Sequence, residues 1–263
     1  MTGICVIVGA TGAMGASVAR RLSTEGRRVL AIARNAEQLD ALAAELHTAG
    51  RGGGARHAGV VPCVADIGDP SSVAAIRGTL DAAGVTRVDL ALMAAGLPVG
   101  GSLDVMPTED LALAAGFKSV ATLHLLRAVE DRLVEGSRFV AVAGSLGLEP
   151  GPADAAPGTS NAALINLMRQ LSQRKGADGV TVHTLAPGPV ETPRLREFAR
   201  RESAETGVPE AEIWQRYISR TSTGRLPSLD EISWFVSTLL APQASVLHGA
   251  VVSLDGGVRR NLF

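Results

Sequence analysis

Short apolar runs alternate with longer stretches of helical period along most of the chain, and this alternation constrains the fold more than any other feature. The runs are rich in Val, Ile, Leu and Ala, which is typical of strands buried on both faces of a parallel sheet. Neighbouring parallel strands need a crossover connection, which the helical stretches supply. The sequence therefore predicts an α/β fold with helices on both faces of a parallel sheet.

The element boundaries follow from where apolar runs give way to helical periodicity. Strands are predicted at Ile4–Val8, Val29–Ala33, Val60–Ala65, Val88–Ala94, Arg138–Ala143, Thr181–Leu185 and Ala250–Leu254. Helices are predicted at Ala13–Thr24, Ala36–Thr48, Ser71–Ala83, Thr108–Leu133, Thr159–Lys175 and Leu229–Leu240. The Gly-rich segment Arg51–Gly59 is predicted to be a surface loop.

Composition limits the domain count and the partners. A chain of 263 residues with 46% hydrophobic content can bury one sizeable core, and we expect a single domain over residues 1–263. A formal net charge of -1 gives no excess of positive charge for binding nucleic acid or an anionic membrane, so neither is expected as a partner. Cys5 and Cys63 lie in apolar runs, which favours reduced, buried thiols over disulfides or a metal site. No stretch reads as a signal peptide or a membrane span, so a cytoplasmic location is expected.

One long segment, residues 188–223, interrupts the alternation. It contains an amphipathic stretch that places Trp214 and Tyr217 on one side. Long ordered insertions in compact domains are often lids over binding sites. We therefore expect a helical lid in which Trp214 and Tyr217 contact a small, fairly hydrophobic ligand.

A glycine-rich turn follows the first predicted strand. It comprises Gly9, Thr11, Gly12, Met14 and Gly15 with the intervening alanines, and it leads directly into a helix. Glycines at such a junction allow a tight turn and close approach of a pyrophosphate, which the N–H groups and dipole of the helix then bind. This context favours a dinucleotide site over a simple tight turn.

With four further markers, this turn resembles the short-chain dehydrogenase/reductase family over essentially the whole chain. The other markers are Asp66-Ile67, Ala95-Gly96, Pro187-Gly188-Pro189-Val190-Glu191-Thr192 and Asp255-Gly256-Gly257, each after a predicted strand. The resemblance implies a doubly wound Rossmann-type sheet with strand order 3-2-1-4-5-6-7 and a cofactor across its carboxyl edge. It also implies assembly into a homodimer or homotetramer.

The residue after the second predicted strand indicates which cofactor is bound. Where NAD-binding proteins carry an acidic residue, this chain has Ala33 followed by Arg34. A guanidinium there suits the 2′-phosphate of NADP(H), although an ordinary surface arginine is the alternative. By resemblance, Asp66 and Ile67 hold the adenine, and Ala95 and Gly96 lie at the adenine ribose. In the motif that begins at Pro187 and Gly188, Val190 and Thr192 meet the nicotinamide carboxamide.

The family's catalytic pattern is altered in this sequence. The resemblance places Pro157 where the family has its catalytic Tyr and Asn161 where it has the Lys one helical turn later. Gly144 stands at the family's Ser position, with Ser145 one residue further on. The chain's one tyrosine, Tyr217, is in the predicted lid. Because proline has no titratable group, the usual proton donor is missing.

Lys118 stands where the family has an Asn on its long fourth helix, so Lys118 and Asn161 read as an exchange of two residues that lie close together. Its helical neighbours at spacings of three, four and seven form an apolar face. Our hypothesis is that Lys118, with a pKa lowered by partial burial, serves as acid or electrostatic anchor beside Ser145 and Asn161. A purely structural lysine between paired helices is the alternative. His124 and His183 are expected to be core histidines.

Three functions remain compatible with the sequence. The first is an NADP(H)-dependent oxidoreductase with non-standard proton delivery, acting on a small carbonyl, alcohol or imine. The second is a non-redox enzyme, such as an isomerase, lyase or cyclase, that reuses the pocket. The third is a cofactor-binding sensor or partner subunit without catalysis. We favour the first, because both ends of the predicted cofactor site look intact.

Overall fold

A computed structural model describes residues 3–49, 59–99, 103–104 and 106–261. This part of the chain forms a 7-stranded sheet in the order β3-β2-β1-β4-β5-β6-β7, with every neighbouring pair parallel. The predicted fold class and strand order are confirmed. The strands are β1 (Ile4–Val8), β2 (Arg28–Ala33), β3 (Val60–Val64), β4 (Val88–Met93), β5 (Arg138–Val142), β6 (Thr181–Pro187) and β7 (Val251–Leu254).

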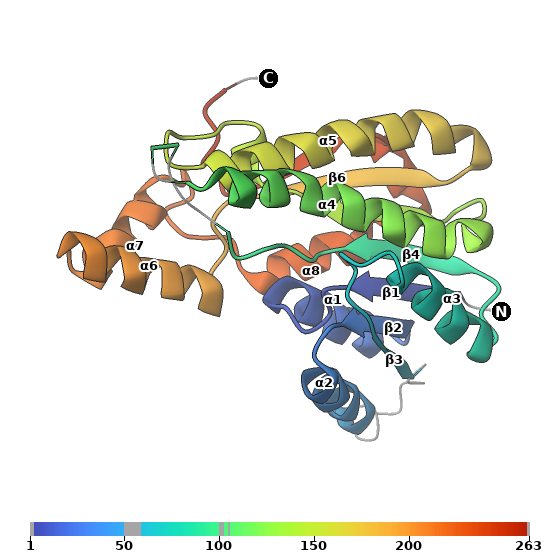
Figure 1. Cartoon of the computed structure of the whole chain (residues 1–263). Helices are drawn as coiled ribbons and strands as arrows, with labels where there is room; N and C mark the ends of the chain where they lie inside the picture. The colour runs from blue at the N-terminus through green and yellow to red at the C-terminus, as the bar shows by residue number, and fades with distance from the viewer. Residues whose placement is uncertain (1–2, 50–58, 100–102, 105, 262–263) are drawn as a thin grey trace.

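Helices cover both faces of the sheet (Figure 1). They are α1 (Ala13–Thr24), α2 (Ala36–Ala49), α3 (Ser72–Ala82), α4 (Thr108–Val129), α5 (Ala155–Lys175), α6 (Pro193–Thr206), α7 (Glu210–Ser219) and α8 (Leu229–Thr238). Two hydrophobic cores result, one on each face. The first packs α3, α4 and α5 against the sheet, and the second packs α1, α2 and α8 against its other side. This arrangement explains why β1 and β2 are almost wholly apolar.

Helix α5 begins earlier than the sequence predicts. The expected start was Thr159, whereas the helix begins at Ala155 and includes Pro157 in its first turn. Proline is tolerated there because the first N–H groups of a helix have no intrahelical acceptor. The other predicted boundaries lie close to the observed ones, and residues 51–58 of the predicted loop lie outside the described residues.

Helix α4 is the one described helix long and apolar enough to cross a membrane. The mean hydropathy over an 18-residue stretch of this helix is 1.2, and 39% of that stretch is buried inside the protein. Ala121, Leu125 and Ala128 on this helix belong to the core that includes α5. The apolar character of α4 is therefore that of a core helix in a layered domain.

Helices α6 and α7 form the segment predicted to be a lid. Figure 1 shows them beyond the end of the sheet toward which β1 points, on the side of its carboxyl edge. Thr192 caps α6 by accepting a hydrogen bond from the Leu195 backbone N–H at 3.1 Å, and Pro193 occupies the first turn. The long insertion therefore folds into two helices anchored next to the last residue of the predicted nicotinamide motif.

The predicted core residues lie where expected. Cys5 and Cys63 are buried free thiols. His124 is buried with its Nδ1 2.8 Å from the Ile67 carbonyl oxygen. His183 is fully buried on β6, and burial lowers its pKa to about 4. Both histidines therefore lie in the core, as predicted.

Candidate active site

The glycine turn after β1 requires glycine at two positions. Gly9 has a φ of +78°, and a Cβ there would lie 2.9 Å from the Ala95 backbone nitrogen. A Cβ on Gly15 would lie 2.2 Å from the Gly9 carbonyl oxygen. The turn is therefore closed by backbone-to-backbone contacts that any side chain would disrupt.

The same turn leaves the start of α1 open to an anion. Gly12 precedes the helix, and no side chain caps it. The first backbone bond of this helix runs from the Ala16 N–H to the Gly12 carbonyl oxygen at 2.8 Å. The N–H groups between them lack intrahelical acceptors, so with the helix dipole they form a site that fits a pyrophosphate.

A groove of about 700 Å³ begins at this turn and follows the carboxyl ends of β1 to β4. Its lining includes most of the predicted cofactor residues: Gly9, Thr11, Gly12, Met14, Arg34, Asp66, Ile67, Ala95, Gly96 and Thr192. Residues from distant parts of the sequence thus meet along one edge of the sheet. A groove of this size is typical of a small-molecule or cofactor site.

The remaining predicted cofactor residues lie elsewhere. Gly15 packs behind the turn against Gly9. Pro187 and Gly188 line a second cavity rather than the groove, and Val190 is buried outside the described lining of both. The structure therefore brings together the phosphate and adenine residues more completely than those of the nicotinamide motif.

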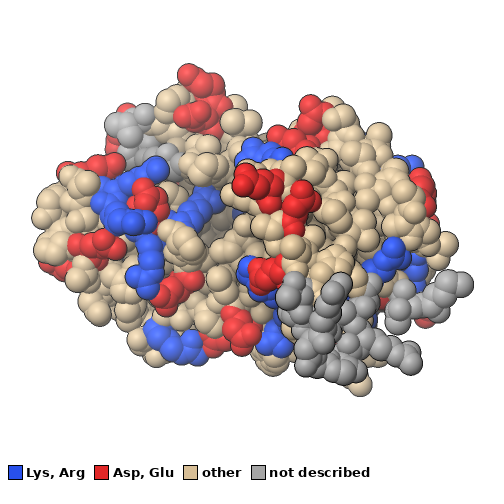
Figure 2. All heavy atoms as spheres, turned by 90° about the horizontal axis from the view of Figure 1, so that it is seen from below, with Lys and Arg blue, Asp and Glu red and all other residues tan. Residues whose placement is uncertain are grey.

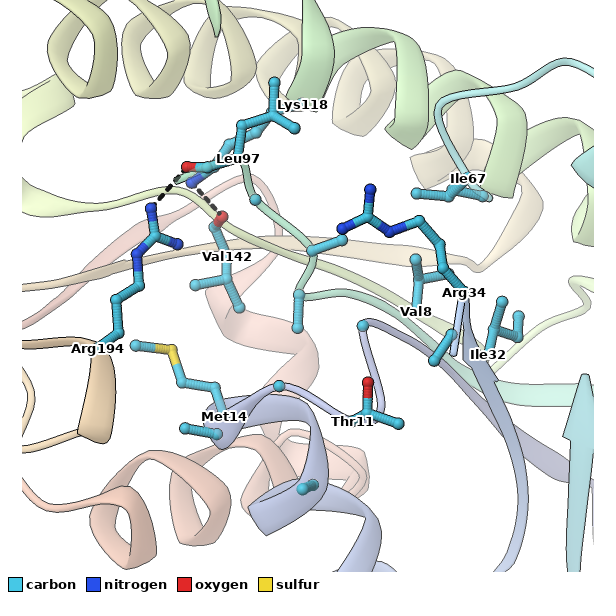
Figure 3. A pocket seen from close by; sticks show the side chains of 18 of the residues that line it. Val8, Thr11, Met14, Ile32, Arg34, Ile67, Leu97, Lys118, Val142 and Arg194 are labelled. Atoms are coloured by element: carbon cyan, nitrogen blue, oxygen red, sulfur yellow. Dashed lines mark hydrogen bonds between the residues drawn. The ribbon is translucent and has the colours of Figure 1, made fainter. Parts of the chain in front are cut away.

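Arg34 extends from the end of β2 over the groove, on the side of Ile67 (Figure 3). Its side chain is 70% exposed, and its Nη1 lies 4.0 Å from an Asp66 carboxylate oxygen. A second arginine, Arg20 on α1, also lines the groove, but Glu45 binds its guanidinium through contacts of 2.6 and 2.9 Å. Arg34 is therefore the more available cation for a phosphate.

A second cavity of about 500 Å³ adjoins the groove, bounded by α4, α5, the carboxyl end of β6 and the helices α6 and α7. The two cavities share a wall made of Met14, Gly96, Leu97, Phe117, Lys118, Ala143 and Arg194. Ser145, Pro157 and Asn161 line only the second cavity. All three residues of the predicted catalytic set, Lys118, Ser145 and Asn161, thus border it.

Lys118 lies in the shared wall with its ammonium fully engaged. Its Nζ donates to the carbonyl oxygens of Val142 at 3.1 Å and Ala143 at 2.9 Å, and to Asn161 Oδ1 at 2.7 Å. Burial, and secondly the positive charge of Arg194, lower its pKa to about 8. The structure therefore brings the predicted pair Lys118 and Asn161 into contact between α4 and α5.

This contact also orients the Asn161 amide. Because Oδ1 accepts from Lys118, the Nδ2 donors point away from it, and a Cβ on Gly144 would lie 2.7 Å from Nδ2. Glycine at position 144 therefore makes room for the amide. Ser145 follows as the first residue of a short 3-10 helix (Ser145–Gly147), and it is buried.

The two aromatic residues predicted for the lid differ in position. Tyr217 lines the second cavity, and its hydroxyl donates to a Glu202 carboxylate oxygen at 2.9 Å. Burial and this carboxylate raise its pKa to about 12. Trp214 is not among the described residues that line either cavity, and the centre of its ring lies 4.7 Å from the Arg196 guanidinium carbon.

Sequence reasoning missed several lining residues. Arg194 lines both cavities and donates to the Leu97 carbonyl oxygen at 2.6 Å, as Figure 3 shows. Leu195 and Phe198, also on α6, form part of the second cavity's apolar lining. The sequence did indicate that α6 lies near the site, because it follows the predicted nicotinamide motif directly. Which of its side chains point into the cavity depends on where the helix lies against the edge of the sheet, and the sequence does not show this.

The fold and the groove define the class of protein: a parallel-sheet domain built to bind a dinucleotide at the carboxyl edge of the sheet. A family model described as "Enoyl-(Acyl carrier protein) reductase" matches residues 9–259. The chain belongs to the short-chain dehydrogenase/reductase family of oxidoreductases.

Individual relatives show the same similarity. A "Putative ketoacyl reductase" of Streptomyces coelicolor is 30% identical over 268 residues, which cover 97% of this chain and 96% of the relative. The Staphylococcus aureus "Diacetyl reductase [(S)-acetoin forming]" is 26% identical over 168 residues, and this match spans 63% of the chain and only 65% of that reductase. The crystal structure of L-sorbose reductase from Gluconobacter frateurii, complexed with NADPH and L-sorbose, has a TM-score of 0.87 at 19% identity, covering 99% of this chain and 98% of that one. At this level of identity the structural likeness concerns the fold.

Proposed function

We propose that this protein is an NADP(H)-dependent reductase of a small, fairly hydrophobic carbonyl or imine compound, with a proton donor other than tyrosine. One observation carries the proposal: the groove that begins at the glycine turn and the adjoining cavity share a wall that contains Lys118. A cofactor in the groove and a substrate in the cavity would meet there.

The residues present fit the cofactor. The open start of α1 suits the pyrophosphate, Arg34 suits the 2′-phosphate, and Asp66 and Ile67 border the place for the adenine. The family membership and the NADPH complex of the sorbose reductase agree with this choice. When bound, NADPH would supply a hydride to the electrophilic carbon of the substrate.

The protein's own part in the reaction is to polarise the substrate and deliver a proton. Lys118 holds the Asn161 amide so that its Nδ2 donors are directed away from the lysine, toward Gly144. Together with the Ser145 hydroxyl, these donors would bind the carbonyl oxygen or imine nitrogen. Lys118, with its pKa near 8, would release its 3.1 Å contact with the Val142 carbonyl oxygen, give that atom its proton and regain one from the solvent. Tyr217 takes no part, because burial and the Glu202 carboxylate raise the pKa of its phenol to about 12, which makes it a weaker acid than Lys118.

The walls of the cavity define the substrate's general character. Leu97, Val99, Leu146, Leu195 and Phe198 contribute apolar surface to a space of about 500 Å³. A space of this size would accommodate a compact organic molecule rather than a polymer.

The experiment is a binding titration followed by a turnover assay. NADPH and NADH are titrated by fluorescence, and a panel of small ketones, diketones, aldehydes and imines is then tested for loss of NADPH absorbance. We expect tighter binding of NADPH than of NADH and oxidation that depends on substrate. Tight NADPH binding without oxidation would favour a non-redox enzyme or a sensor, and binding of neither nucleotide would refute the proposal.

We also propose self-association through α4 and α5 into a dimer or tetramer. Leu113 and Val120, seven residues apart on α4, are 55% and 44% exposed. Large apolar side chains two turns apart on one helix face are typical of an interface. Light scattering after gel filtration tests this, and a monomer at all concentrations would contradict it.

A further inference from the structure

Two arginines in the second cavity differ from the others of the lid segment. Arg196, Arg200, Arg201 and Arg216 each form a salt bridge with a nearby glutamate. Figure 2 shows basic and acidic side chains interspersed on the α6–α7 side of the molecule. Within the described residues, Arg194 and Arg220 have no carboxylate partner, and both line the cavity.

Arg194 is held in a definite position. Its Nη2 donates to the Leu97 carbonyl oxygen at 2.6 Å, and its guanidinium carbon lies 5.4 Å from the centre of the Phe198 ring. These contacts fix the side chain at the cavity wall and leave further N–H donors of the guanidinium for a ligand. Figure 3 shows the guanidinium directed at the Leu97 carbonyl, and its positive charge helps to lower the pKa of Lys118.

Arg220 adds a second cation at the far end of the lid. It follows α7 directly, three residues after Tyr217, and its charge lowers the pKa of the Tyr217 phenol against the other influences on that group. Like Arg194, it lines the second cavity, but unlike Arg194 it is not among the described residues that line the cofactor groove. A ligand bound by Arg220 would therefore belong to the substrate side.

The described lining of the cavity has an excess of positive charge. Lys118, Arg194 and Arg220 face a single acidic residue, Asp154. Asp154 already accepts a hydrogen bond from the Gly151 backbone N–H at 2.8 Å within its own loop. Burial lowers the pKa of Arg194, and its charge in turn lowers that of Lys118. An anion in the cavity would offset these unfavourable charges.

We propose that Arg194 and Arg220 form a carboxylate subsite, so that the substrate of this protein is an oxo acid or a related carbonyl compound with a carboxylate. This inference rests on the proposed reductase function. The planar guanidinium forks bind the carboxylate. The apolar side chains Leu195 and Phe198 contact the body of the substrate, and the reacting carbonyl lies toward Ser145 and Asn161.

The test compares two probes of nearly equal shape, benzoate and benzamide, binding to the NADPH-loaded protein by calorimetry. We expect benzoate to bind about tenfold more tightly than benzamide, because only the anion forms charge-assisted hydrogen bonds. Arg220→Met and Arg194→Met should each abolish most of this preference. Arg216→Met is the matched control: Arg216 lies one turn before Arg220 but is paired with Glu212 at 2.8 Å, and it should keep the preference.

Equal binding of the two probes by the wild-type protein, or a preference that survives Arg220→Met, would overturn the subsite. If Arg194→Met weakens NADPH binding while the preference for benzoate persists, Arg194 serves the cofactor and the two-arginine subsite is wrong. The two proposals can fail separately. Binding of benzoate and benzamide is also measured without NADPH, which tests the subsite alone. A benzoate preference in a protein that does not oxidise NADPH with any carbonyl compound would refute only the reductase. The turnover arm compares 3-benzoylpropanoate with its amide, and faster oxidation of NADPH with the acid supports the subsite.

Discussion

The two halves of the site differ in how closely they follow the family. At the phosphate end, the turn from Gly9 to Gly15 keeps the backbone contacts that only glycine allows, and α1 presents its free N–H groups. At the substrate end, the sequence resemblance predicts Pro157 and Asn161 in place of the family's Tyr and Lys, and Lys118 on α4 donates to Asn161. Binding an anion with backbone groups leaves little room for variation, whereas a proton can be delivered by several side chains.

Lys118→Met should have the largest effect, on the substrate half. We expect kcat to fall by about a hundredfold to ten-thousandfold, because the variant loses the acid and the group that orients Asn161. NADPH affinity should change far less, since the glycine turn is untouched. Steady-state kinetics with any substrate from the turnover assay measures this. Lys175→Met, which alters the other lysine at its surface pair with Asp178, is the control.

The pH profile sharpens the same prediction. Burial and Arg194 lower the pKa of Lys118 to about 8, so its ammonium form is lost as pH rises through that value. The rate of reduction should therefore fall about tenfold per pH unit above about 8. This limb should be absent from Lys118→Met, and its persistence there would assign the proton to another group.

Gly15→Ala tests the phosphate half and should have the next largest effect. The added Cβ would lie 2.2 Å from the Gly9 carbonyl oxygen, and the backbone would have to move. Overpacking of this kind costs about 1–3 kcal/mol, so NADPH affinity should fall about tenfold to hundredfold. Gly78→Ala on α3, where a Cβ meets nothing within 4 Å, is the matched control. Wild-type affinity in Gly15→Ala would show that the cofactor does not use this turn.

Arg34→Ala tests which dinucleotide the phosphate half selects. The preference for NADPH over NADH should fall about tenfold, the lower end for a charge-assisted contact, because the side chain is 70% exposed and partly screened. Arg20→Ala should leave the preference intact, since Glu45 already binds that guanidinium. Fluorescence titration of both variants with NADPH and NADH measures this preference. An equal loss of the preference in Arg34→Ala and Arg20→Ala would contradict the assignment of Arg34 to the 2′-phosphate.

Tyr217→Phe should have the smallest effect, although the family's proton donor is a tyrosine. Its hydroxyl donates to Glu202, and the loss of one such hydrogen bond should change kcat by no more than about threefold. The measurement is kcat of Tyr217→Phe, determined under the same conditions as kcat of Lys118→Met. A fall as large as that of Lys118→Met would make Tyr217 the acid and reverse the roles proposed for the two residues.

The strand order was implied by the family resemblance, whereas the residues alone determined the layered α/β fold and the glycine turn. These features depend on local patterns: apolar runs of strand length, helical periodicity and glycines at a strand-to-helix junction. The early start of α5 was missed because the tolerance of a first turn for Pro157 does not reveal how far the helix extends before it.

Only the tertiary structure decided which side chains meet across the site. Lys118 and Asn161 are 43 residues apart, and their contact depends on the packing of α4 on α5. Arg194 and Arg220 stood out only once their neighbours were seen to be paired with glutamates and they themselves were seen to line the cavity. Local propensity sets where each element begins and ends, whereas burial, charge pairing and the lowered pKa of Lys118 depend on which elements pack together.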